Sequence, residues 1–252
     1  MQENEIDLDT PDGRMNAWLF RPSGKPPAPG VLLFMDAPGV REELKEMARA
    51  ISSKGYVVLL PNLYYRTDRH VDFSPERFAA VGETLREEMF AKVRSLDFPK
   101  VLRDAAAMLD YLAWRADVAG RSYVAIGYCM SGRWVAAAAI AFPERFAAIA
   151  SFYGTGLVTQ RADSPHRRIA EAKGELYFAF AQNDAFVPAS DVSTLRDVLA
   201  TTNTPYTVEV YPGTQHGFAF RRGHYHPQAA ERHWRAIFDL LERRLPTTAA
   251  EG

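Results

Sequence analysis

Short apolar runs that alternate with amphipathic helical patterns limit what this chain can fold into more than any other feature. Six runs predict buried strands, and a helical pattern follows most of them: Val31 to Met35, Tyr56 to Leu60, Ser122 to Ile126, Ala147 to Tyr153, Glu175 to Ala181 and Tyr206 to Tyr211. Because such strands pair through right-handed crossovers, the pattern predicts an α/β protein with a mostly parallel sheet flanked by helices. An opening antiparallel pair, Ile6 to Leu8 and Met15 to Phe20, raises the expected number of strands to eight.

The spacing of the helical patterns and the lack of any linker predict one domain over residues 1–252. Between residues 62 and 96 the sequence is polar and charged, so we expect an irregular excursion over one end of the sheet. Residues 246–252 have nothing to hold them in place and are expected to be frayed. Helices are expected over Glu42 to Lys54, Phe98 to Trp114, Met130 to about Ala141, Asp191 to Ala200 and Pro227 to Arg244.

The charge and hydropathy of the chain exclude several classes of protein. With 30 basic and 31 acidic residues, the formal net charge is −1, which provides no electrostatic footprint for nucleic acid or an anionic membrane. No apolar run approaches the roughly 18 residues of a membrane span, and the acidic N-terminus lacks the apolar region of a signal peptide. The single cysteine cannot form an internal disulfide. A cytoplasmic protein is therefore expected.

The segment from Gly127 to Gly132, Gly-Tyr-Cys-Met-Ser-Gly, lies between a predicted strand and a predicted helix. A nucleophile elbow needs this setting, and its strained turn requires small residues two positions before and two after the nucleophile. Centred on Cys129, these positions hold Gly127 and Ser131, whereas centring on Ser131 places Arg133 at one of them, where an arginine fits badly. The pattern favours Cys129 as a nucleophile over an inert core thiol, with Ser131 as the alternative.

Two later residues complete a candidate catalytic trio. Asp184 follows the predicted strand Glu175 to Ala181, and His216 follows Tyr206 to Tyr211. Open parallel sheets place their sites at the carboxyl ends of strands, and the order nucleophile, acid, histidine is that of α/β-hydrolases. A thiol attacks as the thiolate and needs a base such as histidine. The trio therefore predicts acyl transfer.

A metal site is the alternative use of the histidines. His224 and His226 could join His216, but no acidic or cysteine ligand accompanies them at a familiar spacing. We therefore expect neither a metal nor a cofactor, and expect the nearby Arg221, Arg222 and Arg232 to be solvated.

These motifs together resemble the dienelactone hydrolase (carboxymethylenebutenolidase) family, from roughly Met15 to Leu241. The family's Gly-Tyr-Cys-x-Gly-Gly elbow corresponds to the segment around Cys129, with Ser131 replacing one glycine. Its Asp before Phe-Val-Pro matches Asp184, its His-x-Phe matches His216 to Phe218, and its Pro-Asp-Leu-Tyr segment occurs as Pro61-Asn62-Leu63-Tyr64. The resemblance implies the α/β-hydrolase fold.

The chain departs from the family's pattern at two places. The resemblance places Asp36 where the family has a glutamate that influences the protonation of the cysteine; a plain turn-forming aspartate is the alternative. It also implies two arginines that hold a substrate carboxylate. Arg86 aligns with one of them and Phe220 stands at the other, while a solvated arginine and a core aromatic residue are the alternatives. Tyr128, beside the nucleophile, is grouped with these modulating or substrate-binding residues.

The sequence thus predicts hydrolysis of a small-molecule ester or lactone through Cys129. His216 would move the proton, Asp184 would orient His216, and the backbone N–H groups of Met130 and Ala37 would form the oxyanion hole. Two other classes stay open: a serine-type esterase that uses Ser131, and a non-catalytic binding protein that keeps the fold.

Overall fold

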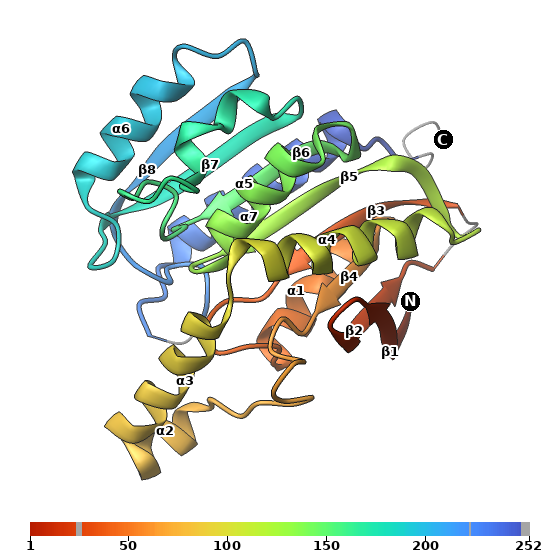
Figure 1. Ribbon diagram of the computed structural model, residues 1–252, viewed down its shortest axis with the longest axis horizontal. Coiled ribbons are helices and arrows are strands. Elements are labelled where there is room, and N and C mark those ends of the chain that lie inside the picture. The colour runs from red at the N-terminus through yellow and green to blue at the C-terminus, as the bar shows by residue number, and fades with distance from the viewer. Residues whose placement is uncertain (24–26, 222, 248–252) are drawn as a thin grey trace. The chain divides into compact units, whose positions relative to one another are not determined.

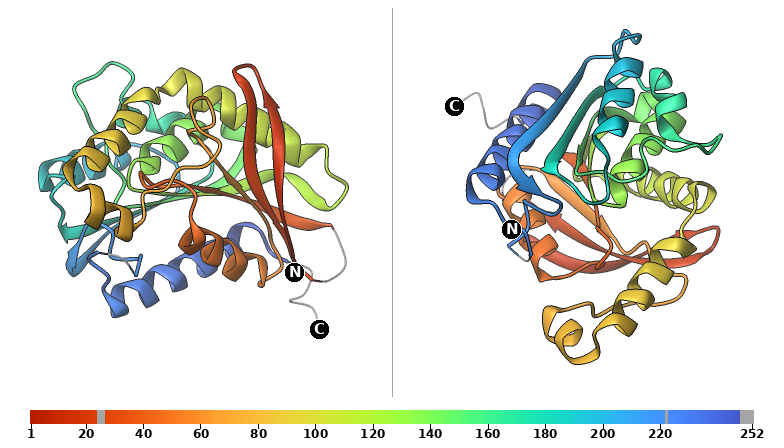
Figure 2. Two further views of the ribbon diagram at one scale, coloured as in Figure 1. Left: turned by 90° about the horizontal axis from the view of Figure 1, so that it is seen from below. Right: turned by 90° about the vertical axis from the view of Figure 1, so that its left-hand side faces the viewer.

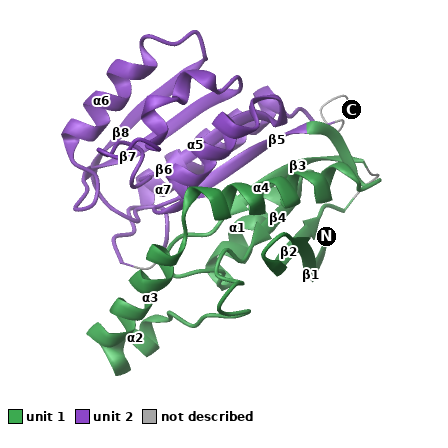
Figure 3. Ribbon diagram, in the orientation of Figure 1, with its two compact units in different colours: residues 1–121 green, residues 122–252 purple. Residues whose placement is uncertain are grey.

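The computed structural model describes residues 1–23, 27–221 and 223–247. It divides into two compact units, residues 1–121 and 122–252, which are described separately (Figure 3). Eight strands form a mostly parallel sheet flanked by helices, so the predicted fold class is confirmed (Figure 1). The single domain stays a prediction, and most of the tail predicted to be frayed, residues 248–252, lies outside the described residues.

Unit 1 begins with the predicted antiparallel pair. Both strands are longer than predicted. Their pairing begins beside the turn, at Thr10 and Gly13, and continues without a break to Gln2 and Arg21. The strand order is β1-β2-β4-β3; β2 pairs antiparallel with β4, and β3 pairs parallel with β4. The elements are β1 (Gln2–Thr10), β2 (Gly13–Arg21), β3 (Ala28–Phe34), α1 (Glu42–Ser52), β4 (Val57–Pro61), α2 (Pro75–Val81), α3 (Glu83–Ser95) and α4 (Phe98–Ala113).

The helices of unit 1 differ in how much apolar surface they bury. Helix α1 packs on β2 and β4 through Leu44, Met47, Ala48 and Ile51, the spacing of one helical face. By contrast, α2 buries no residue and α3 buries only Leu85. The break in the alternation predicted at residues 62–96 therefore contains two helices that contribute little to a core.

Unit 2 carries four parallel strands. They are β5 (Val118–Tyr128, which begins just before the boundary), β6 (Phe146–Phe152), β7 (Glu175–Asn183) and β8 (Tyr206–Gln215). Helices α5 (Ser131–Ala141) and α6 (Ala189–Leu199) cover one face of these strands, and α7 (Pro227–Arg244) covers the other (Figure 2). Short 3₁₀ helices span Pro143–Arg145, Pro165–Arg167 and Ile169–Glu171.

The four strands are parallel, so all of their carboxyl ends lie at the same end of the sheet. Strands β5 and β6 end together at the pair Tyr128–Phe152, whereas β7 and β8 continue past Ala179, the partner of Phe152, to the pair Asn183–Gln215. The residues that directly follow the four strands at this end are Cys129, Tyr153, Asp184 and His216. Among the described residues, no helix is both long and apolar enough to cross a membrane.

Candidate active site

Cys129 sits in a strained turn between β5 and α5. Its φ is +53°, a left-handed conformation that is uncommon for a residue with a side chain and costs on the order of 1 kcal/mol. The turn is held on both sides: the N–H of Cys129 donates to the carbonyl of Phe152 (3.1 Å), and its own carbonyl accepts from Gly132 and Thr155 (3.1 and 2.9 Å). Its side chain is half-buried. This is the geometry of a nucleophile elbow.

Glycine is required at both ends of the elbow segment. A Cβ on Gly127 would lie 2.5 Å from the carbonyl oxygen of Ser131, and a Cβ on Gly132 would lie 2.3 Å from the Cα of Gly154. The position that tolerates no side chain after the nucleophile is thus Gly132, one residue later than Ser131, the small residue expected from the elbow pattern.

Ser131 is the first residue of α5 and is completely buried. Cys129 is the more accessible of the two candidate nucleophiles. A group that attacks a substrate must be reachable, so the burial of Ser131 weighs against the serine alternative.

Asp184 and His216, predicted as acid and base, lie side by side. The Nδ1 of His216 is 3.0 and 2.9 Å from the two carboxylate oxygens of Asp184. The carboxylate is fully buried, and 14% of the His216 side chain is exposed. A buried carboxylate at Nδ1 fixes the orientation of the ring and directs Nε2 away from the acid.

The environment of His216 favours its protonated form. Burial alone would lower the pKa of His216, but the hydrogen bond with Asp184 and the interaction with Cys129 outweigh it and raise the pKa to about 10. The Nε2 atom is buried and has no hydrogen-bond partner among the described residues, although Cys129 lies near enough to raise the pKa of the ring. Catalytic hydrogen bonds often tighten only when substrate binds.

This raised pKa predicts a pH dependence. We expect His216 to titrate near pH 10 in the folded protein and near 6.5 when unfolded. The imidazolium therefore stabilises the fold fully below pH 6.5, and its contribution is lost as the pH rises through about 10. NMR titration of the His216 ring measures the midpoint, which should fall in Asp184→Asn and in Cys129→Ser. A wild-type midpoint near 6.5 would contradict the arrangement.

Two aromatic rings outside the predicted site residues contact His216. Tyr153, fully buried, packs edge-on against the imidazole with ring centroids 5.0 Å apart, and its φ is +40°. Phe186, in the loop after β7, packs against the same imidazole, with ring centroids 4.8 Å apart. Tyr153 had no signal in the sequence beyond its place at the end of a predicted strand, whereas Phe186 is the phenylalanine of the Phe-Val-Pro segment that follows Asp184.

Tyr128 and Phe220 belong to a buried aromatic cluster. Their ring centroids are 5.1 Å apart, and their exposed fractions are 0% and 4%. The Tyr128 hydroxyl shares a 2.7 Å hydrogen bond with Nε2 of His233 on α7, where complete burial lowers the pKa of His233 to about 3. This packing is that of core aromatic residues, so direct contact of Tyr128 or Phe220 with substrate stays a prediction.

Three further predicted residues, Asp36, Ala37 and Arg86, lie in unit 1. Asp36 is 8% exposed at its side chain and forms a two-point ion pair with Arg41, which also contacts Glu43 at 3.1 Å. Ala37 is buried, and its carbonyl accepts from the Tyr64 hydroxyl. Arg86 is 59% exposed and lies 3.6 Å from Glu83 on the same helix, as a solvated arginine would. The predicted roles of Asp36 at the thiol, of Ala37 in the oxyanion hole and of Arg86 in binding a substrate carboxylate stay predictions.

The structure also bears on the alternative of a metal site. Within residues 1–23, 27–221 and 223–247, no three His, Cys, Asp or Glu side chains gather as a metal site; Arg222 lies outside these ranges.

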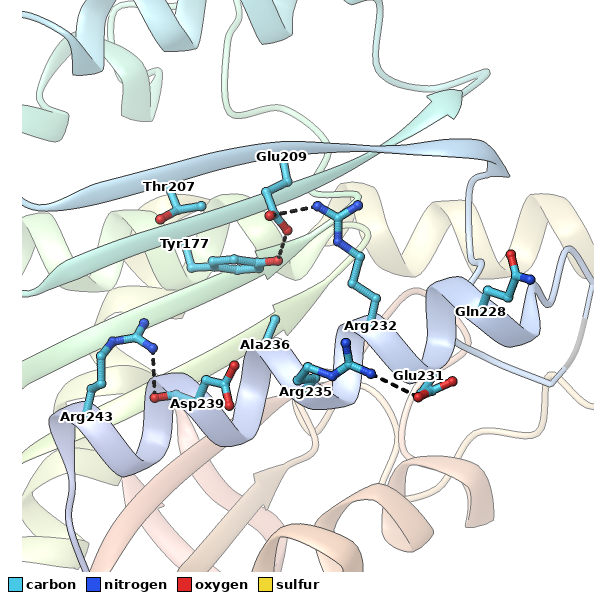
Figure 4. A pocket seen from close by; sticks show the side chains of 10 residues that line it. All are labelled: Tyr177, Thr207, Glu209, Gln228, Glu231, Arg232, Arg235, Ala236, Asp239 and Arg243. Carbon is cyan, nitrogen blue, oxygen red and sulfur yellow. Dashed lines mark hydrogen bonds and ion pairs between the residues drawn. The ribbon is translucent and has the colours of Figure 1, made fainter.

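A cavity of about 360 Å³ opens between α7 and the strands β7 and β8 (Figure 4). There Glu209 accepts from Tyr177 and pairs with Arg232, and Arg235 pairs with Glu231. These charges are satisfied within the protein.

Comparison with known proteins gives a consistent family. The model of the dienelactone hydrolase family matches residues 15–245. A protein of Azospirillum brasilense, provisionally named a carboxymethylenebutenolidase, is 29% identical, over 87% of this chain and 89% of its own. One of Synechocystis sp. with the same provisional name is 25% identical, over 90% and 91%. The crystal structure of a provisionally assigned dienelactone hydrolase from Klebsiella pneumoniae shares the fold, with a TM-score of 0.81, 23% identity, and coverage of 95% and 97%.

Proposed function

Because the chain belongs to the dienelactone hydrolase family and is therefore a hydrolase, we propose that it cleaves small esters or lactones through a thioester on Cys129. One observation carries the proposal: a half-buried cysteine in a strained strand-to-helix turn lies near an imidazole that a buried carboxylate orients. His216 is the acid and base, and Asp184 positions it and stabilises its positive charge.

In the first half of the reaction the Cys129 sulfur attacks the carbonyl carbon. The imidazolium of His216 stabilises the attacking thiolate, as expected for a ring with a raised pKa. A carbon–sulfur bond forms and the carbonyl oxygen becomes an oxyanion. When the carbon–oxygen bond to the alcohol breaks, His216 gives its Nε2 proton to the alcohol oxygen, and the acyl group remains on sulfur.

In the second half, water replaces the sulfur. The neutral His216 takes one proton from water while the water oxygen bonds to the acyl carbon, and the carbon–sulfur bond then breaks. The carboxylic acid leaves, and the thiolate and imidazolium are restored. A lactone follows the same steps, except that its alcohol stays attached to the acyl group until hydrolysis.

The backbone at the start of α5 suits the oxyanion. Met130 immediately follows the nucleophile and is the residue that precedes the first turn of the helix. Its N–H group is our proposed donor, and one such donor typically contributes about 3 kcal/mol in the transition state. Ala37 as the second donor stays a prediction from the sequence.

The substrate that we propose is neutral. Phe220 occupies the position where the family resemblance implies a second arginine, and it is buried among aromatic rings. A phenyl ring cannot pair with a substrate carboxylate, and bringing an unpaired carboxylate into an apolar site is costly. An ester without a carboxylate avoids this cost.

Alkylation of the single cysteine tests the proposal. We expect the protein to hydrolyse a neutral aryl ester, and at least as well as its analogue with a carboxylate on the acyl part. Iodoacetamide should remove this activity in proportion to the fraction of Cys129 labelled, measured by mass spectrometry. A non-catalytic binding protein gives no turnover before labelling, and a serine esterase that uses Ser131 retains turnover after it.

A further inference from the structure

Phe186 exposes an aromatic ring beside the candidate catalytic histidine. It lies in the loop between β7 and α6 (Figure 1), and 57% of the residue is exposed. The next residue, Val187, is buried, and Pro188 begins the approach to α6, so the loop is anchored directly after Phe186. Among the large apolar residues that the described part of the chain exposes, Phe186 is the one that contacts His216.

The same residue also touches the acid of the trio. The N–H of Phe186 donates to a carboxylate oxygen of Asp184 at 2.8 Å. The ring contact with His216 and the backbone hydrogen bond to Asp184 together fix the position of the Phe186 side chain. His216 thus contacts two aromatic residues, the buried Tyr153 and the exposed Phe186.

The chemistry of His216 tells which part of a substrate lies nearest to this exposed ring. In the proposed reaction His216 gives its proton to the alcohol oxygen, so the alcohol part of the substrate must lie beside the imidazole. The acyl carbon, in contrast, lies at the Cys129 sulfur. A ring packed on His216 is therefore placed to meet the substituent on the alcohol oxygen.

We propose that Phe186 is a specificity-determining residue that binds the apolar alcohol part of the ester or lactone. The inference rests on the proposed function. An exposed phenyl ring covered by a substrate phenyl or alkyl group removes apolar surface of both from water. Partial burial of one such ring corresponds to an effect of about tenfold in kcat/KM.

Two isomeric esters separate this role from a structural one. Benzyl acetate carries its phenyl group on the alcohol, and methyl phenylacetate carries it on the acyl part. In Phe186→Ala we expect kcat/KM for benzyl acetate to fall about tenfold and that for methyl phenylacetate to change less than twofold. Phe186→Leu should keep most of the activity toward benzyl acetate. Tyr206→Ala, which truncates an exposed aromatic residue at the far end of β8, is the matched control and should change neither.

The other outcomes overturn the inference. Equal losses on both esters would mean that Phe186 only supports Asp184 and His216, and a selective loss on methyl phenylacetate would place the ring at the acyl part. No loss on either ester would remove Phe186 from the site. Cys129→Ala, measured in parallel, tests the proposed function separately: if that variant still cleaves both esters, the thioester mechanism fails whatever Phe186 does.

Discussion

Cys129→Ala should lose at least about 10⁴-fold in the hydrolysis of a neutral aryl ester, while Ser131→Ala keeps most of it. The first change removes the atom that would bond to the acyl carbon. The second removes a hydroxyl that is completely buried in the first turn of α5, away from solvent. Steady-state kcat/KM of the two variants, only two positions apart, measures the difference.

The two variants also serve as controls for each other. Each replaces a small side chain by a methyl group, so neither opens a large cavity, and thermal unfolding should show both variants folded. If Ser131→Ala loses the activity and Cys129→Ala retains it, the nucleophile is the serine and the proposed thioester does not form.

His216→Ala should be nearly as damaging as loss of the nucleophile. In the proposed reaction the imidazole both stabilises the thiolate and protonates the alcohol as it leaves, so the variant loses both contributions. Asp184→Asn should be severe but less complete, because an amide still contacts Nδ1 but lowers the stability of the imidazolium and favours the wrong tautomer. Values of kcat/KM for each single variant and for the Cys129→Ala/His216→Ala double variant test this.

The double variant carries the sharper information. The effects of residues that act as a unit are not additive. The kcat/KM of the double variant should therefore be about the same as that of the more damaged single variant. A double variant with the product of both losses would mean that Cys129 and His216 act independently. For Asp184, whose buried carboxylate also anchors the Phe186 loop, unfolding must be measured beside activity.

Much of the fold could be predicted because buried parallel strands are nearly continuous apolar runs. The bounds of α7 agree with the sequence because Pro227 suits the first turn and the His226 side chain accepts from the N–H of Ala229. Strand β8 was predicted to end at Tyr211, since Pro212 and Gly213 are typical turn residues. It continues to Gln215 through an irregular register with β7, in which the side chain of Gln182 accepts from the N–H of Gly213. Such a side-chain contact between strands leaves no local pattern.

The candidate trio was predictable in part for the same reason. Asp184 and His216 directly follow strands, and parallel pairing brings such residues to one edge. The contact of the two rings with His216 was not predictable, because an aromatic residue near the end of a strand is as typical of a core as of a site. Whether Phe186 is exposed or buried depends on how its loop is anchored, which only the contacts with Asp184 and Val187 decide.

The hydrogen bonds around Cys129 have a consequence for local unfolding. The N–H of Cys129 donates to Phe152 at the end of β6, and its carbonyl accepts from Thr155 in the loop after β6. The turn at Cys129 and the end of β6 therefore cannot open separately without breaking these hydrogen bonds. Tyr153, whose N–H donates to Ala179 at 2.6 Å, extends this link to β7. Opening of the turn therefore costs the free energy of a larger cooperative element, even though Cys129 and Tyr153 themselves lie outside regular secondary structure. The strained conformation of Cys129, which belongs to no helix or strand, is thus stabilised by hydrogen bonds to neighbouring segments.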